Sequence, residues 1–419
     1  MRGHVLSPIS QTDVRRLVLG GAISSYGDAL QNAAQAWIVV QLTHSGRAVG
    51  LFAMVWLLPR TISSLVAGVL ADRGARVRVI GGAVVIGTVF SAIFLAVAAT
   101  GALSYAVVLL LALGLGLTAP FEIVGRNALL ATLGPPEEIP AIVNLSFFVM
   151  YCAELLGLVT SGLLLSSVGP LGCIALNLIT YLAYLALLAR VRTPRVERAP
   201  QRLHHAFREG VRFVLGNRRA AVPLLIGSLL AITGFHFERS TLPLFAVEDL
   251  HASARQYGLL LAASPLGAVL TLGLLRTDAA ALRARVIGSA FALAIALALL
   301  ALVTRPAAAF PILVFLGSAR GLHYNAIATF LQMRVPDAMR GRVFALYNVA
   351  GGLFGVGGLL MGWTAATVGA RVSAHVAPFG AVGDVHGLRG ALLLAAAASA
   401  AAALVARAAI ERPAAPAPS

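Results

Sequence analysis

Four polar side chains recur on one face of an apolar stretch near residues 17–42. Asp28, Gln31, Asn32 and Gln35 stand at positions i, i+3, i+4 and i+7, which lie on the same side of an α-helix. An ionisable group at the centre of a bilayer costs at least about 2.5–3.5 kcal/mol on insertion scales, so such a face needs an explanation. We expect it to line a water-filled cavity. Hydrogen bonding between helices without substrate contact is the alternative.

A carboxylate also stands inside the apolar stretch near residues 140–166. Glu154 has no basic residue nearby in the sequence to neutralise it. A buried carboxyl group that gains and loses a proton can exchange that proton for a substrate. The alternatives are a permanently protonated glutamate and a glutamate paired with an arginine of another helix.

Two further apolar stretches carry ionisable and aromatic groups. Glu238 and Arg239 are adjacent on one of them, where neighbouring positions point in different directions and need not pair with each other. Arg320 and Tyr324 lie one helical turn apart on the other. This basic and aromatic face would suit an anionic or aromatic substrate, or would supply a counter-charge for a buried carboxylate. We favour the counter-charge for Arg320, because an unpaired arginine at that depth costs more than a paired one.

The composition places these groups in a membrane protein. Hydrophobic residues make up 59% of the 419 residues and charged residues only 11%, whereas soluble domains carry about 25% charged residues. The mean hydropathy is +0.88. The net charge of +16 does not indicate a nucleic-acid-binding face, because the arginines punctuate apolar stretches in the manner of membrane loops.

Twelve stretches are long and apolar enough to be membrane-spanning helices, which need about 20 residues each. They lie near residues 17–42, 48–71, 77–99, 102–125, 140–166, 168–190, 220–246, 256–275, 284–304, 307–331, 341–368 and 388–410. The sequence therefore predicts an all-α, polytopic membrane protein.

The arginines predict the orientation of the chain. With the N-terminus placed in the cytoplasm, 24 arginines fall in cytoplasmic segments and 5 in outer segments. Cytoplasmic loops of membrane proteins carry an excess of basic residues. We therefore expect a multi-pass protein of the cell (inner or plasma) membrane with both termini in the cytoplasm.

One long basic connection divides the predicted helices six and six. It runs from Arg190 to Arg219 and contains a predicted amphipathic segment from His205 to Leu215. A division into six and six helices is typical of transporters built from two related bundles. We predict an N-terminal six-helix bundle over 1–190, a cytoplasmic linker over 191–219, a C-terminal six-helix bundle over 220–410 and a disordered tail over 411–419.

A short charged turn between the second and third stretches resembles a known signature. Transporters of the major facilitator superfamily carry Gly-x-Leu-Ala-Asp-Arg-x-Gly-Arg-Arg/Lys between transmembrane helices 2 and 3. The chain matches this pattern at Gly68, Leu70, Ala71, Asp72, Arg73 and Arg76. The second glycine of the pattern stands one place earlier here, at Gly74. A generic turn of the positive-inside kind is the alternative.

Further stretches resemble the drug:proton antiporter branch of this superfamily, which includes macrolide and enterobactin (siderophore) exporters. They lie at 24–30, 37–45, 208–218, 242–244, 257–260 and 331–343, in the order of that branch. The last of them reads Leu-Gln-Met-Arg-Val-Pro-Asp-Ala-Met-Arg-Gly-Arg-Val. Many exporters also carry Gly-Pro-x-x-x-Gly in helix 5, whereas the run from Gly157 to Gly162 keeps both glycines and lacks the proline.

The resemblance implies the major facilitator fold, with alternating access to a cavity between two six-helix halves. In this family the loop aspartate, here Asp72, latches the cytoplasmic side against the N-terminal end of helix 11, near Arg340. Arg126 is the candidate for the arginine that joins this charge network, and a helix-end ion pair with Glu122 is the alternative. The residues expected to form the conformational gate are Gly68, Asp72, Arg73, Arg76, Arg126 and Arg340.

The expected function is proton-coupled efflux of small hydrophobic molecules, such as drugs or secondary metabolites, by a monomer in the lipid bilayer. Glu154 or Asp28 is the expected proton carrier, followed by Glu238. Without an enzyme motif or a phosphate-cradling Gly-x-x-x-x-Gly-Lys, we expect no ATP, metal, cofactor or nucleic acid as partner. The alternatives are an exporter of siderophores or another endogenous metabolite, a lysolipid flippase, and a sensor that keeps the fold without transport.

Overall fold

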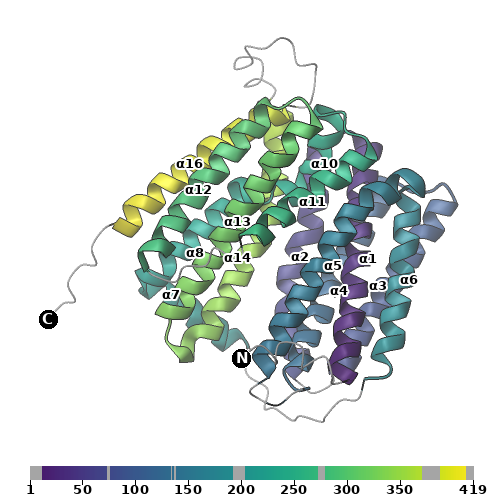
Figure 1. Cartoon of the computed structure of the whole chain (residues 1–419), viewed down its shortest axis with the longest axis horizontal. Helices are drawn as coiled ribbons and strands as arrows, with labels where there is room; N and C mark the ends of the chain where they lie inside the picture. Colours follow the sequence, from purple (N-terminus) through teal and green to yellow (C-terminus); the bar gives the residue numbers. More distant parts are fainter. Residues whose placement is uncertain are drawn as a thin grey trace. The chain divides into compact units, whose positions relative to one another are not determined.

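The computed structural model describes residues 12–72, 76–133, 135, 138–191, 203–271, 279–369 and 387–411. These residues form helices and short connections, and no strand occurs among them (Figure 1). The all-α prediction is therefore confirmed. The predicted tail lies outside the described residues from residue 412 onward.

Six long helices make up the first part of the chain. Their bounds are α1 Thr12–Thr43, α2 Gly46–Asp72, α3 Arg76–Ala99, α4 Tyr105–Leu130, α5 Ile139–Ser167 and α6 Gly169–Leu188. Two of their ends have clear local causes. Ser104 caps the N-terminus of α4 by accepting a hydrogen bond from the Val107 amide at 3.4 Å. Gly169, at φ +72°, lets the chain turn directly from α5 into α6.

The second part of the chain has more broken helices. Their bounds are α7 Leu203–Gly216, α8 Arg218–Leu230, η2 Ala231–Phe235, α9 Phe237–Ser240, α10 Leu242–Leu244, η3 Phe245–Asp249, α11 Ala254–Leu270, α12 Ala279–Leu302, α13 Pro306–Arg334, α14 Asp337–Thr364, η5 Ala365–Gly369 and α16 Leu388–Glu411. The segments labelled η are π-helical. The predicted span 220–246 thus consists of α8 to α10 with one π-helical segment inside it and a second at its end.

Each of the twelve predicted spans falls on one of these helices or on consecutive helices. By length and hydropathy, seven helices among the described residues are long and apolar enough to cross a membrane, or eight when the bent α7–α8 pair is counted as one span. Helix α1 falls outside this group because its face of polar side chains lowers its hydropathy. The polar side chains of α1 therefore weaken the hydropathy signal of this helix.

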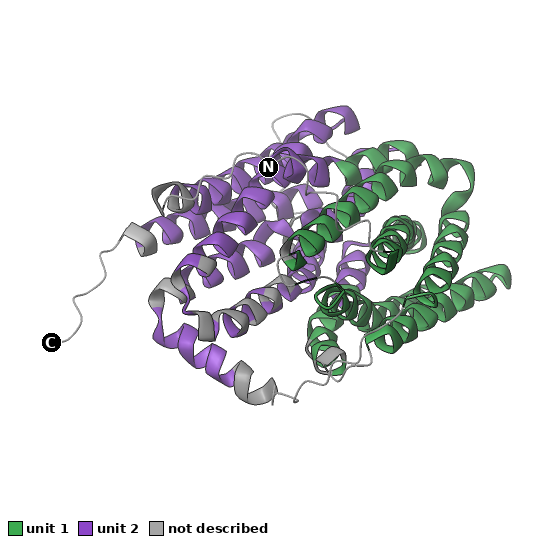
Figure 2. Cartoon of the chain, turned by 60° about the horizontal axis from the view of Figure 1, so that its bottom comes forward, with its two compact units in different colours: residues 1–44, 55–203, 253–262 green, residues 45–54, 204–252, 263–419 purple. Residues whose placement is uncertain are grey.

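The chain divides into two compact units (Figure 2). Unit 1 consists of Met1–His44, Val55–Leu203 and Ser253–Ala262, and unit 2 of Ser45–Met54, His204–Ala252 and Ala263–Ser419. Two helices, α2 and α11, contribute residues to both units. The six-plus-six domain boundaries stay a prediction.

Within unit 1, α1 packs most extensively against α6 and α5, and α3 packs against α4 and α6. Fully buried Leu17, Ile80, Leu129 and Tyr184 meet in one apolar core drawn from α1, α3, α4 and α6. Within unit 2, α12 packs most extensively against α16 and α13, while α14 packs against η2. These pairings determine which polar side chains can meet.

Glycines allow the closest of the helix contacts in unit 1. A Cβ on Gly157 of α5 would lie 2.6 Å from the Tyr26 carbonyl oxygen and 2.8 Å from the Ala29 Cβ of α1. A Cβ on Gly162 would lie 2.6 Å from the Arg255 carbonyl oxygen at the start of α11. The two glycines noted in the sequence therefore serve close helix packing, as expected for small residues between membrane helices.

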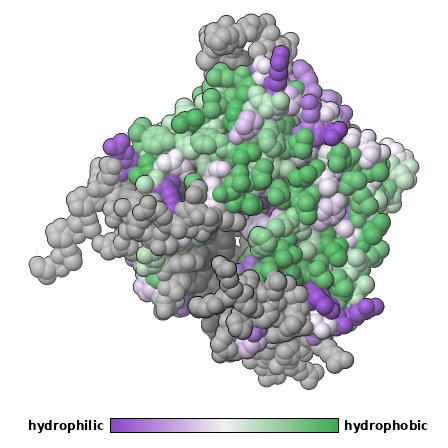
Figure 3. All heavy atoms as spheres, in the orientation of Figure 1, coloured by the Kyte–Doolittle hydropathy of each residue, from purple (hydrophilic) through white to green (hydrophobic). Residues whose placement is uncertain are grey.

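The outer surface of the helices is apolar. In Figure 3, hydrophobic side chains cover the middle of the face drawn over the helices of unit 1, and hydrophilic ones gather toward its upper and lower ends. Ile62, Leu110 and Ile179 are each more than half exposed. Such a continuous apolar surface fits a protein surrounded by lipid rather than water.

Substitution of Gly157 by alanine should destabilise the α1–α5 contact, since the new methyl group would overlap a backbone carbonyl. We expect a loss of about 1–3 kcal/mol, the usual cost of overpacking, seen as a lower thermal unfolding midpoint of the detergent-solubilised protein. Gly82→Ala is the matched control, because a Cβ there meets nothing within 4 Å. Equal midpoints for the two variants would contradict the packing role of Gly157.

Candidate functional site

A hydrogen-bonded cluster surrounds the half-buried Asp28 in unit 1. Tyr181 of α6 donates its hydroxyl to the Asp28 carboxylate, and Asn177 donates to the same oxygen at 3.5 Å. Gln31 accepts from Asn177 at 2.8 Å and from Ser91 of α3 at 2.9 Å. We call these five residues, on three membrane helices, the Asp28 cluster.

The close approach of α6 to α1 makes this cluster possible. A Cβ on Gly27 would lie 2.1 Å from Asn177 Oδ1 and 2.1 Å from Thr180 Oγ1. Only a glycine leaves room for these side chains beside the α1 backbone. Gly27 therefore helps to bring Asn177 within reach of Asp28 and Gln31.

The remaining side chains of the predicted polar face of α1 have fewer hydrogen-bond partners. Gln35 is completely buried, and its amide oxygen and nitrogen have no hydrogen-bond partner. Asn32 is half-buried. Buried amides without partners are rare, because their desolvation is not repaid. The face predicted from spacing thus contains a hydrogen-bonded end at Asp28 and an unsatisfied end at Gln35.

Glu154 is half-buried on α5. Glu154 lies on α5 within the predicted span 140–166, and it belongs to the same unit as Asp28. The hydrogen bonds described above for the Asp28 carboxylate come from α6.

In unit 2 an ion pair joins the short helix α9 to the long helix α13. Arg320 of α13 pairs with Glu238 of α9, and both side chains are nearly buried. This is the counter-charge expected for Arg320. Arg239, the sequence neighbour of Glu238, is exposed, so the two adjacent residues point in different directions as expected. Glu238 stands between the π-helical segments η2 and η3, and π-helical turns occur often at functional sites.

Tyr324 contributes to an aromatic group beside this ion pair. Its ring centroid lies 6.0 Å from that of Phe235, 6.1 Å from that of Tyr347 and 6.2 Å from that of Phe354. The Tyr347 hydroxyl also donates to the Tyr324 carbonyl at 3.3 Å. The aromatic face predicted on this helix is therefore packed against neighbouring rings within unit 2.

Contacts or local packing can be described for three of the predicted gate residues, namely Arg76, Arg126 and Gly68. Arg76 is buried at the start of α3 and donates to Thr132 at 3.3 Å. Arg126 pairs with Glu122 one helical turn earlier, which is the alternative that the spacing had indicated. Glu122 also accepts from the Tyr184 hydroxyl at 3.0 Å. Gly68 lies in α2, where an added Cβ would meet nothing within 4 Å.

The other predicted gate residues fall outside what can be described. Arg73 lies in the gap between α2 and α3. Asp72 ends α2 and Arg340 lies in the first turn of α14, but their side chains are outside the described residues. The latch between them stays a prediction.

Sequence reasoning missed several partners. Asn177 and Tyr181 stand at i and i+4 in the span near 168–190, a signal that could have marked a second polar face. Asp249, at the end of η3, accepts from Arg389 at 3.1 Å, an ion pair between segments 140 residues apart. No local pattern in the sequence connects such distant residues.

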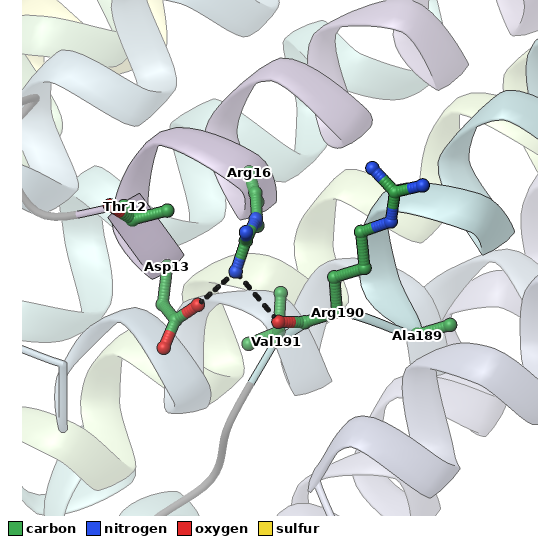
Figure 4. A pocket seen from close by; sticks show the side chains of 6 residues that line it. All are labelled: Thr12, Asp13, Arg16, Ala189, Arg190 and Val191. Carbon is green, nitrogen blue, oxygen red and sulfur yellow. Dashed lines mark hydrogen bonds and ion pairs between the residues drawn. The ribbon is translucent and has the colours of Figure 1, made fainter.

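A polar cavity of about 520 Å³ opens where α1 begins and α6 ends. Arg16 projects into it, with hydrogen bonds to Asp13 at 3.1 Å and to the Arg190 carbonyl at 2.8 Å (Figure 4). The side chain of Arg190 points away from this contact in the same view. The cavity lies at a helix end, and Arg16 holds the beginning of α1 to the end of α6.

The buried ion pair of unit 2 should be strongly coupled. Glu238→Leu or Arg320→Met alone leaves one charge buried without its counter-charge, and we expect each to cost about 3–5 kcal/mol of stability. The double variant should recover most of that loss in a double-mutant cycle of unfolding in detergent. The half-exposed pair of Glu209 and Arg342, 2.7 Å apart, is the matched control and should show at most about 1 kcal/mol.

A family model described as transmembrane secretion effector matches residues 4–415 of the chain. No curated protein matches the chain. Similar solved structures include a bacterial homologue of the human lysosomal transporter Spinster, in an inward-facing and unoccupied conformation. Its sequence is 17% identical and its TM-score is 0.71, with 96% of this chain and 98% of that chain covered. At such identity the likeness shows the fold alone.

Two further solved structures show the same likeness. An auto-inhibited peptide transporter of the POT family is 14% identical, with a TM-score of 0.76 and coverage of 96% of this chain and 97% of that one. A D-xylose–proton symporter is 17% identical, with a TM-score of 0.70 and the same coverage. All three cover nearly the whole of both chains, so the shared fold extends over the full described protein.

Proposed function

The chain belongs to the major facilitator superfamily, in the family described as transmembrane secretion effector, and on that premise we propose that it exports small hydrophobic molecules in exchange for protons. Family and fold indicate a membrane transporter rather than an enzyme. The export direction, the proton and the class of cargo belong to the proposal. Drugs and secondary metabolites are the cargo that the resemblance to drug:proton antiporters favours.

The surroundings of Asp28 carry the proposal. Its carboxylate receives hydrogen bonds from two neutral side chains, Tyr181 and Asn177, within a bundle of apolar helices. Glu238 differs, because Arg320 neutralises it. A carboxylate held by neutral donors can lose its charge by protonation without leaving an unpaired arginine behind. Asp28 is therefore the preferred proton carrier, with Glu154 as the second candidate.

Protonation drives transport only if it stabilises one conformation more than the other. The hydrogen bonds to Asp28 supply such a difference, since they link α1 to α6 when the carboxylate is ionised and change when it is protonated. Rocking of the two six-helix halves around a midplane site then accompanies proton uptake and release. In transporters of repeat architecture, alternating access works by rocking of one bundle against the other.

Two other cargoes stay as alternatives. An endogenous metabolite such as a siderophore, or a lysolipid, would use the same scaffold. The buried charged and polar groups of α1, α9 and α13 argue against a sensor without transport, because such groups are costly in a bilayer and a purely structural protein gains little from them. The names of the solved neighbours do not choose among cargoes at 14–17% identity.

Substitution of Asp28 by asparagine should abolish proton-driven export while the protein stays folded. The probe is ethidium flux into inverted vesicles, with and without a collapsed pH gradient. We expect at least a tenfold loss of gradient-dependent flux in Asp28→Asn and its partial retention in Asp28→Glu. Asp13→Asn, on the same helix and paired with Arg16, is the matched control. Unchanged flux and pH dependence in both Asp28→Asn and Glu154→Gln would rule out these carriers.

The gate hypothesis makes a separate prediction for Asp72. Removal of its charge in Asp72→Asn should slow transport several-fold without weakening ethidium binding to the purified protein, because the residue acts on the conformational equilibrium and not on the substrate. Flux in vesicles and equilibrium binding in detergent measure the two effects. Lost binding with a normal rate of conformational exchange would contradict the role as a latch.

A further inference from the structure

Helix α7 (Leu203–Gly216) meets the next helix at nearly a right angle. The segment Arg208–Gly216 is bent by 104° relative to Ala221–Phe235, across a break of a few residues. The second segment begins the predicted seventh span. When that span crosses the bilayer, α7 lies close to parallel with the membrane surface, at the level where the span begins.

One side of α7 is held by unit 2. Glu209 pairs with Arg342 of α14 at 2.7 Å. Gly210 packs on the same residue so closely that a Cβ would lie 3.1 Å from the Arg342 Cβ and 3.2 Å from its carbonyl oxygen. These contacts fix which side of the helix faces the protein.

The opposite side of α7 presents two arginines between apolar side chains. Positions 208, 211, 212 and 215 follow the i, i+3, i+4, i+7 spacing of one face. Arg208 and Arg212 are exposed, and Leu215 is 80% exposed. Together with Val211 and Gly216 they line a groove of about 640 Å³. An exposed leucine is unfavourable in water. Beside two arginines it suits the boundary between lipid headgroups and acyl chains, where the leucine contacts the chains and the arginines contact the headgroups.

We propose that α7 lies in the headgroup layer of the bilayer and binds anionic phospholipid through the face of Arg208, Val211, Arg212 and Leu215. The guanidinium groups contact the phosphate, and the two aliphatic side chains contact the upper acyl chain. A basic side chain near an anionic membrane surface is attracted through its charge, and lysine and arginine contribute alike. The proposal concerns the lipid around the protein and is independent of the cargo and of the proton carrier.

The first experiment measures the depth of α7 in the membrane. A spin label is attached at Gly216→Cys, where a side chain meets nothing within 4 Å, in a full-length chain with both native cysteines replaced by alanine. The chain is placed in nanodiscs of phosphatidylcholine with or without phosphatidylglycerol. With phosphatidylglycerol, we expect the label to collide with oxygen more than with a water-soluble nickel complex. A label that stays water-accessible in both lipids would overturn the proposal.

Charge variants separate lipid binding from loss of structure. Arg208→Gln with Arg212→Gln should return the label toward water, whereas the corresponding double lysine variant should keep most of the effect. Arg305→Gln, an exposed arginine at the start of α13, is the matched control and should behave as the parent chain. Equal label depth in the double glutamine variant and the parent would overturn the proposal.

Lipid titration gives the size of the effect. Native mass spectrometry of the full chain in detergent should show phosphatidylglycerol binding weakened about fivefold for each arginine removed, as expected for a basic residue near an anionic surface. Glycerol phosphate, the soluble headgroup, should not displace the lipid at equal concentration. Displacement by glycerol phosphate, or equal binding of phosphatidylcholine, would show that the face binds something other than anionic lipid.

Discussion

Asp28 and Glu238 depend on side chains of neighbouring helices for their partners, because the helix backbones have already used their own hydrogen-bonding groups and lipid offers none. The Asp28 cluster satisfies this constraint with neutral donors from α3 and α6. The Arg320–Glu238 pair satisfies it with opposite charges. The two units therefore use different chemistry to place a carboxylate in an apolar environment.

That difference bears on the proton exchange that we propose. An arginine partner stabilises the ionised form of a carboxylate strongly, whereas hydrogen bonds from neutral groups such as Tyr181 and Asn177 stabilise it less. A transporter that exchanges protons needs a group of the second kind and a rigid frame around it. Within unit 2, the ion pairs of Arg320 with Glu238 and of Arg389 with Asp249 tie separate segments of the chain together.

The sequence predicts the elements far better than the contacts between them. The apolar stretches of the sequence coincide with helices, because lipid exposure imposes apolar side chains over a fixed length, although only seven or eight helices among the described residues pass the test of length and hydropathy. The cost of an unpaired arginine is enough to predict a counter-charge for Arg320 but not to choose Glu238 over Asp28. That choice depends on which helices pack together, and glycines such as Gly27 set the distance between them. The π-helical turns around α9 also escape a pattern of 3.6 residues per turn.

Those π-helical turns make the register of this span part of its chemistry. Each π-helical turn accommodates about one residue more than an α-helical turn, so the residues beyond it are rotated by roughly 100° relative to an uninterrupted helix. Glu238 follows η2, and its orientation toward α13 therefore depends on the extra residue that η2 contains. The ion pair therefore depends on the length of this segment and not only on its residue types. A deletion of a single apolar residue in Ala231–Phe235 would leave hydropathy almost unchanged and yet turn the carboxylate away from Arg320.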